Sequence, residues 1–129
     1  MHPAALTEQG LGPALAGVAK RRPINVDVKA PDERLPENIE ATAYYIVSEA
    51  LTNVAKHAQA TKAKVDMSMT DNVLKFEITD DGRGGADPSA GSGILGLRDR
   101  AEAVGGTLFV ISPPGKGTVA TAQLPLSGA

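Results

Sequence analysis

Two hydrophobic patterns alternate along the chain and predict its secondary structure. The spacing of apolar residues follows the period of an amphipathic helix in residues 13–20, 37–58 and 94–104. Apolar and polar residues alternate, as in a strand with one buried face, in residues 24–29, 62–70, 74–79, 107–112 and 118–126. Asp71 and Asn72 are favourable turn residues between two of these strands, which we therefore expect to form an antiparallel hairpin.

This order of elements favours an α+β fold. The chain gives a helix, a strand, a long helix, two strands, a helix and two strands. The economical arrangement is a two-layer α/β sandwich, in which a mostly antiparallel mixed sheet carries helices on one face. We expect residues 1–129 to form a single domain. Within it, residues 1–23 form an N-terminal helical segment and residues 127–129 a tail.

Composition narrows the classes of function. The chain contains no cysteine, which excludes disulfides and cysteine-based metal sites. A net charge of −2 and an aromatic content of 3% argue against nucleic-acid binding. No apolar run approaches the roughly 18–20 residues that span a bilayer, and no signal peptide is visible. We expect a cytoplasmic domain without membrane contact of its own, whether or not its parent protein is membrane-anchored.

A glycine-rich stretch, DDGRGGADPSAGSGILGL at residues 80–97, is the first candidate for chemistry. Such backbone approaches ligands closely, and its amides can surround phosphate oxygens at the start of a helix. The same composition is also typical of a surface connection, so the stretch alone leaves both interpretations open. A Rossmann motif is rejected because the preceding strand ends about a dozen residues before Gly91. No Walker A pattern is present either.

A polar stripe borders the apolar face of the long helix. At roughly 100° per residue, it gathers Glu49, Asn53, Lys56 and His57. One explanation is a solvated flank, with an i, i+4 hydrogen bond between Glu49 and Asn53. The other is a row of ligand groups placed beside the core. No cluster with the spacing of a zinc site occurs.

Four motifs in order give the sequence a resemblance to a known superfamily. They are Glu49-x-x-x-Asn53-x-x-Lys56-His57-Ala58, Asp80-Asp81-Gly82-Arg83-Gly84, Gly91-Ser92-Gly93-Ile94-Leu95-Gly96-Leu97 and Gly115-Lys116-Gly117-Thr118. Together they resemble the N, G1, G2 and G3 boxes of the GHKL ATP-binding domains of histidine kinases, which have the Bergerat fold. The phrases SEALTNVAKHA and GLRDRAEAVGG are similar to sensor kinases of the nitrate-sensor type. The resemblance covers roughly residues 1–126.

The resemblance implies an adenine site around the G1 box. Asp80 would accept a hydrogen bond from the exocyclic amine of adenine, whereas guanine would present a carbonyl there. Gly82 and Gly84 would let the backbone pass close to the purine. Thr118 would support the adenine site through water.

The resemblance also implies a phosphate site. Asn53 would offer an oxygen to Mg²⁺, Glu49 would act as a base or hydrogen-bond acceptor, and Lys56 and His57 would meet phosphate oxygens. His57 has an alternative role as a charge partner at the helix C-terminus. The lid and nucleotide contacts implied by the G2 box are Gly91, Gly93, Ile94, Gly96 and Leu97. The ligand set is thus ATP with Mg²⁺.

The implied function is phosphoryl transfer in a two-component sensor histidine kinase. The domain would pass the γ-phosphoryl to a histidine on a dimerisation domain that precedes residues 1–23, and the response regulator would be an indirect partner. The only histidines, His2 and His57, lie outside an acceptor helix, so we expect ATP binding with little or no turnover. The phenylalanine-containing box of many kinases is absent too.

Alternatives and flanking residues complete the expectations. An anti-sigma-type serine kinase shares these boxes, and a non-catalytic GHKL-fold interaction module would keep the fold without nucleotide. Asp81 and Arg83 are expected to be solvated turn residues. Arg98 and Arg100 are expected to form surface pairs with Asp99 or Glu102, which lie beside them in sequence.

Overall fold

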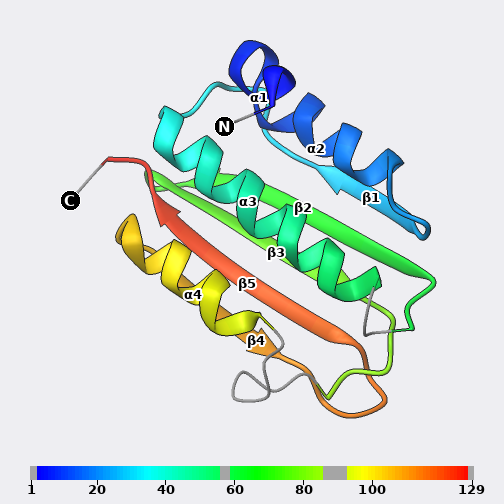
Figure 1. Cartoon of the computed structure of the whole chain (residues 1–129). Helices are drawn as coiled ribbons and strands as arrows, with labels where there is room; N and C mark the ends of the chain where they lie inside the picture. The colour runs from blue at the N-terminus through cyan, green and yellow to red at the C-terminus, as the bar shows by residue number, and fades with distance from the viewer. Residues whose placement is uncertain (1–2, 56–58, 86–92, 128–129) are drawn as a thin grey trace.

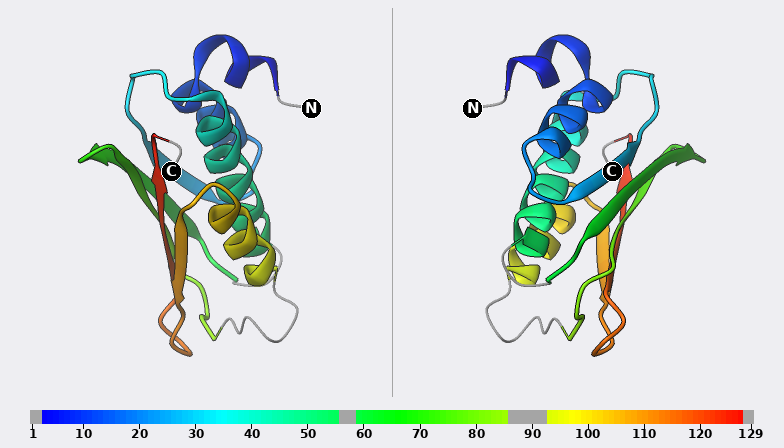
Figure 2. Two further views of the ribbon diagram at one scale, coloured as in Figure 1. Left: turned by 90° about the vertical axis from the view of Figure 1, so that its left-hand side faces the viewer. Right: turned by 90° about the vertical axis from the view of Figure 1, so that its right-hand side faces the viewer.

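The computed structural model describes residues 3–55, 59–85 and 93–127 and has the predicted α+β architecture. Helices form one layer and a single sheet the other, and the opposite face of the sheet carries no helix (Figures 1 and 2). The elements are α1 (Ala4–Gln9), α2 (Leu11–Lys20), β1 (Asn25–Lys29), α3 (Glu37–Asn53), β2 (Lys62–Thr70), β3 (Val73–Asp80), α4 (Ile94–Ala103), β4 (Thr107–Ile111) and β5 (Thr118–Pro125).

The sheet is mixed and mostly antiparallel, as predicted. Its five strands follow the order β1-β2-β3-β5-β4. β1 runs parallel to β2, while β2–β3, β3–β5 and β5–β4 are antiparallel. The β2–β3 hairpin turns at Asp71 and Asn72, whose φ angles of 53° and 62° are those of a two-residue turn that matches the strand twist. The predicted turn pair is therefore confirmed.

The core lies between the helices and the inner face of the sheet. Alternation within β3 places Leu74, Phe76 and Ile78 on the inner face, where they are buried. The helical period of α3 places Ile39, Ile46 and Val47 opposite them, also buried. Burial of these side chains contributes roughly 1.5–3 kcal/mol each. The strand period and the helix period therefore specify the same core.

The N-terminal segment differs from the prediction. Helix α1 was not predicted, and α2 begins at Leu11 instead of Pro13. A helix of six residues has little stability of its own, and a tertiary contact explains it. The guanidinium of Arg34 donates hydrogen bonds to the last-turn carbonyls of Leu6, Thr7 and Glu8 at 3.2–3.5 Å. Hydrophobic periodicity carries no signal for that contact.

Arg34 also forms an ion pair that we call the Arg34–Glu40 clamp. Its Nε and Nη2 donate to the two oxygens of Glu40 at 3.0 Å each. The amide of Leu35 donates to Oε2 at 3.1 Å. Glu40 is only 3% exposed, and this is the one salt bridge among the residues that the structure describes. The clamp therefore fixes α1 against the start of α3.

The far end of α3 also departs from expectation. The regular helix ends at Asn53, and Val54 and Ala55 continue it as a π-helical turn. Such turns are frequent at functional sites because they alter side-chain direction within a helix. The last part of the helix predicted over 37–58 lies outside the described residues. Within residues 3–55, 59–85 and 93–127, no helix combines the length and apolar character needed to cross a bilayer.

Candidate functional site

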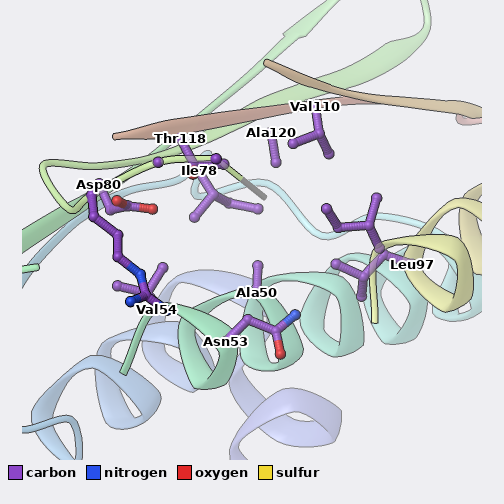
Figure 3. A pocket seen from close by; sticks show the side chains of 13 residues that line it. Ala50, Asn53, Val54, Ile78, Asp80, Leu97, Val110, Thr118 and Ala120 are labelled. Carbon is purple, nitrogen blue, oxygen red and sulfur yellow. The ribbon is translucent and has the colours of Figure 1, made fainter. Parts of the chain in front are cut away.

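A cavity of about 270 Å³ opens between the sheet and the ends of two helices. Figure 3 shows Ile78, Ala120 and Val110 on the sheet side, with α3 residues facing them across the space. The full lining is Ala50, Asn53, Val54, Ile78, Asp80, Arg83, Gly84, Gly85, Ile94, Leu97, Val110, Thr118 and Ala120. A mostly apolar cavity with a few polar groups is the usual form of a small-molecule site.

Asp80 supplies the buried charge of the cavity. As the last residue of β3 it lies two positions after Ile78 on the same inner face, and it is only 8% exposed. Its Oδ1 accepts a hydrogen bond from the Gly82 amide at 2.8 Å. Burial raises the pKa of Asp80, the amides of Gly82 and Thr118 oppose that shift, and neighbouring Asp81 adds to it. No cation pairs with this carboxylate among the described residues.

Thr118 lies beside Asp80 on the neighbouring strand. The two residues are register partners in the antiparallel β3–β5 pair. The hydroxyls of Thr118 and Ser112 lie 2.6 Å apart, so they share a hydrogen bond that restricts the Thr118 rotamer. The predicted neighbours Asp80 and Thr118 are thus brought together in one wall of the cavity.

Gly84 lines the cavity, and tight packing also requires a glycine at this position. Its φ is +65°, and a Cβ there would lie 2.1 Å from the Pro113 carbonyl oxygen. The same segment is hydrogen-bonded to the β4–β5 loop, from Gly85 N to Ser112 O and from Gly115 N to Arg83 O. The close approach seen at Gly84 is therefore to that loop. Its predicted approach to a purine stays a prediction.

The N-terminus of α4 meets the end of α3. Gly93 caps α4 with φ +85°, and a Cβ there would lie 3.3 Å from Nδ2 of Asn53. Ile94 and Leu97 are buried and line the cavity next to Asn53. The structure therefore brings the N-box asparagine and the described part of the G2 box to the same place.

Other predicted site residues lie at the margin or beyond the described chain. Glu49 is half-buried and does not line the cavity. It makes no hydrogen bond with Asn53, so the i, i+4 hydrogen bond expected for a solvated flank is absent. Gly82 and Gly96 are not among the lining residues either. The predicted ligands Lys56, His57 and Gly91 lie outside the described residues.

Two flanking residues have partners that were not predicted, and a third borders the cavity. The Asp81 carboxylate accepts hydrogen bonds from Thr61 N, Thr61 Oγ1 and Lys62 N at 2.6–3.0 Å. These bonds lower the pKa of Asp81 to about 2, so this exposed residue ties the start of β2 to the end of β3. Arg100 stacks on Tyr45, 3.7 Å from the ring centroid, and pairs with neither Asp99 nor Glu102. Arg83 is exposed, as expected, and it also borders the cavity.

The apolar side of the cavity was missed by motif reasoning. Ile78, Ala120 and Val110 form one row across three strands, since Ile78 pairs with Ala120 and Ala120 with Val110. Strand alternation could have identified Ile78, because it precedes Asp80 by two residues on the same face. The pairing of β3 with β5 was needed to add the other two. The remaining missed residues are Ala50, Val54, Arg83 and Gly85.

Comparisons with known proteins define the class of this chain. The family described as "Histidine kinase-, DNA gyrase B-, and HSP90-like ATPase" matches residues 38–128. The chain belongs to this family.

Sensor kinases are among its relatives. The oxygen sensor histidine kinase NreB of Staphylococcus carnosus is 31% identical over 98% of this chain and 40% of its own length. The sensor histidine kinase NarS of Mycobacterium tuberculosis is 36% identical over 98% of this chain and 32% of its own. The chain thus spans well under half of these relatives. The nitrate-sensor-like subfamily remains a prediction.

A solved structure agrees with the fold. The blue-light activated histidine kinase of Erythrobacter litoralis EL346 superposes with a TM-score of 0.76 at 27% identity. That match covers 91% of this chain and 42% of the other. The chain is therefore a histidine-kinase-type ATPase domain in both sequence and architecture.

Proposed function

We propose that this chain is the Mg-ATP-binding catalytic domain of a sensor histidine kinase. The observation that carries the proposal is Asp80, a buried carboxylate with no cation partner among the described residues, set into an apolar cavity beside Thr118. A charge held in this way has little structural use, because its burial disfavours the charged form. A ligand with a hydrogen-bond donor at one edge and an apolar body would compensate it.

Adenine has that chemistry. Its exocyclic amine donates a hydrogen bond, which the Asp80 carboxylate accepts, and its ring fits against the row of Ile78, Ala120 and Val110. Guanine would place a carbonyl oxygen against the carboxylate and leave both acceptors unsatisfied. The cavity therefore favours ATP over GTP.

The phosphates would lie toward the meeting point of α3 and α4. Asn53 offers a side-chain oxygen there, and Gly93 opens α4 with backbone amides. No group of three or more acidic or histidine side chains gathers among the described residues. That suits Mg²⁺, which is usually held by one or two protein oxygens and the substrate phosphates. When bound, Mg²⁺ neutralises phosphate charge.

Glu49, Lys56, His57 and Gly91 complete the proposed phosphate site. Glu49, one turn before Asn53, would accept a hydrogen bond from the attacking group, and the other three would contact phosphate or the lid. The phosphoacceptor would be a histidine on a dimerisation domain of the same kinase, with a response regulator as the indirect partner. The relatives NreB and NarS are sensor histidine kinases, which supports this assignment.

Nucleotide titrations of the 129-residue chain test the proposal. We expect ATP and ADP to bind in Mg²⁺, and GTP and inosine triphosphate, which lack the 6-amino group, to bind at least about 100-fold more weakly. Absence of ATP binding, or equal binding of ATP and inosine triphosphate, would overturn the assignment. With labelled ATP, this chain alone should incorporate little phosphate, whereas addition of the dimerisation domain should yield an acid-labile phosphohistidine.

A further inference from the structure

Arg83 differs from the arginines that the structure gives a structural task. Arg22 donates to Ser48 O and Thr52 Oγ1, Arg34 forms the clamp, and Arg100 stacks on Tyr45. Arg83 lines the cavity, yet its guanidinium has no hydrogen bond, ion pair or ring contact with any described residue. Even Asp80, in the same cavity, is not within ion-pair distance. The side chain is therefore available to a ligand.

The backbone of Arg83 is held firmly. Its carbonyl accepts a hydrogen bond from Gly115 N at 2.5 Å, and two residues later Gly85 N donates to Ser112 O at 2.7 Å. Between them, Gly84 packs against the Pro113 carbonyl too closely for a side chain. A long side chain on a fixed backbone loses less freedom on binding a ligand than one on a mobile loop.

The position of Arg83 identifies the part of the ligand that it would touch. It follows Asp80 by three residues and is tied to the loop that leads into Thr118. These residues lie on the sheet side of the cavity, whereas Asn53 comes from α3 and adjoins Gly93 at the start of α4. A purine bound by its edge at Asp80 leaves a ring face for a planar guanidinium, and arginine stacks well on aromatic faces.

We propose that Arg83 is a nucleotide-binding residue that stacks its guanidinium on the purine ring. The inference rests on the proposed function, because it requires an adenine in the cavity. It assigns Arg83 to the base instead of the phosphates. Its contribution would therefore be the same for adenosine and for ATP.

Titrations followed by amide chemical shifts test this, because they report weak binding of adenosine as well as tight binding of ATP. Arg83→Ala should weaken adenosine and ATP by the same factor, about tenfold. Arg83→Lys keeps the charge but not the planar group and should recover less than half of that loss in free energy. Arg21→Ala removes one positive charge from an exposed position outside the cavity and should change neither affinity.

Two results would overturn the stacking role while leaving the proposed function intact. One is that the wild-type chain binds ATP, but Arg83→Ala binds adenosine as tightly as the wild type does. The other is a loss confined to ATP that Arg83→Lys restores, which would indicate a phosphate contact. If the wild-type chain bound no ATP at all, the proposed function would fail first. Thermal unfolding should be unchanged in Arg83→Ala, because the side chain has no partner to lose among the residues that the structure describes.

Discussion

Two buried carboxylates lie toward opposite ends of α3, and their pKa values are shifted in opposite directions. Glu40, in the first turn, is 3% exposed, and Asp80, across the cavity from the last turn, is 8% exposed. They are the buried charged residues among those that the structure describes. Burial alone would raise the pKa of both groups, so any difference between them comes from their partners.

The partners separate a structural acid from a ligand-binding one. Burial raises the pKa of Glu40, but the hydrogen bonds from Arg34 and Leu35 outweigh it and leave the pKa below its ordinary value. Asp80 has only backbone amides to oppose burial, and its pKa stays raised. Partners within the chain therefore offset the cost of burying the Glu40 carboxylate. The cost of burying Asp80 is not offset in this way, so a ligand that donates a hydrogen bond to it would be favourable. Buried charges that lack a partner are candidate functional groups for this reason.

The largest expected effect concerns the wall that supports Asp80. Gly84→Ala would place a Cβ against the Pro113 carbonyl at positive φ, and should cost about 3 kcal/mol of unfolding free energy or more. Gly85→Ala is the matched control, since its φ of +76° is similar but, its sequence neighbours aside, no atom of the described residues lies within 4 Å of the added Cβ. It should cost about 1 kcal/mol. If urea denaturation gave the same loss of unfolding free energy for both variants, the backbone around Gly84 and Pro113 would be able to shift at little cost.

Asp80→Asn should separate binding from stability. It keeps the size of the side chain but gives the amine of adenine a weaker acceptor, so ATP affinity should fall about 100-fold, roughly 2.8 kcal/mol. It also removes a buried charge without a cation partner, so the unfolding free energy should rise by about 1 kcal/mol. Calorimetric titration and urea denaturation measure the two effects. A variant that lost both stability and binding would mean that Asp80 is a structural acid like Glu40.

Glu40→Ala should have the converse effect. It removes the two carboxylate oxygens that accept from Arg34 and the partner of the Leu35 amide, and should cost about 2 kcal/mol of stability. ATP affinity should not change, because Glu40 lies outside the cavity. Arg34→Ala should also destabilise, and the double variant should lose less than the sum of the two. Faster hydrogen exchange in α1 would report release of that helix, and additive losses would show that the clamp is not coupled.

Acid unfolding should distinguish the same two carboxylates with smaller effects. The pKa of Glu40 is lowered in the folded state, so its contribution is present above its ordinary value of 4.5 and is lost as pH falls through the folded value. Asp80 has a raised folded pKa, so its protonation on acidification relieves a penalty. The loss of unfolding free energy between about pH 5 and pH 2 should be shallower in Glu40→Gln and steeper in Asp80→Asn. The same slope in both variants would contradict the opposite signs of the two pKa shifts.

The sequence predicted those parts of the fold that depend on local pattern. Strand alternation and helix period located β2, β3, α3 and α4, and the turn at Asp71 and Asn72 followed from residue preference. Helix α1 was missed because a distant arginine stabilises it. Asp81 is exposed, as expected, but its hydrogen bonds were not predicted for a similar reason: its partners Thr61 and Lys62 are about 20 residues away in sequence.

The candidate site was predictable where a motif supplied chemistry. Asp80, Asn53, Gly84, Ile94, Leu97 and Thr118 were named from motifs, and all six line the cavity. The apolar row across β3, β5 and β4 was not, because apolar residues in a strand look alike until the strand order is known. Arg83 was missed because a charged residue in a glycine-rich turn is normally solvated. Motifs thus identified the polar residues of the cavity and the start of α4, and tertiary structure supplied the apolar row of the sheet.

The smallest expected effect concerns the hydrogen bond between the hydroxyls of Ser112 and Thr118, beside Asp80. Ser112→Ala removes the hydroxyl that shares a 2.6 Å hydrogen bond with Thr118, so the Thr118 hydroxyl becomes free to rotate. ATP affinity should fall about two- to threefold, and Ser112→Thr, which restores a hydroxyl, should recover it. Thr107→Ala, exposed at the other end of β4, is the control. If Ser112→Ala bound ATP like the wild type while Thr118→Ala did not, the rotamer of Thr118 would be set by β5 alone. Asp80 would then be supported by the strand pairing and not by a side-chain network.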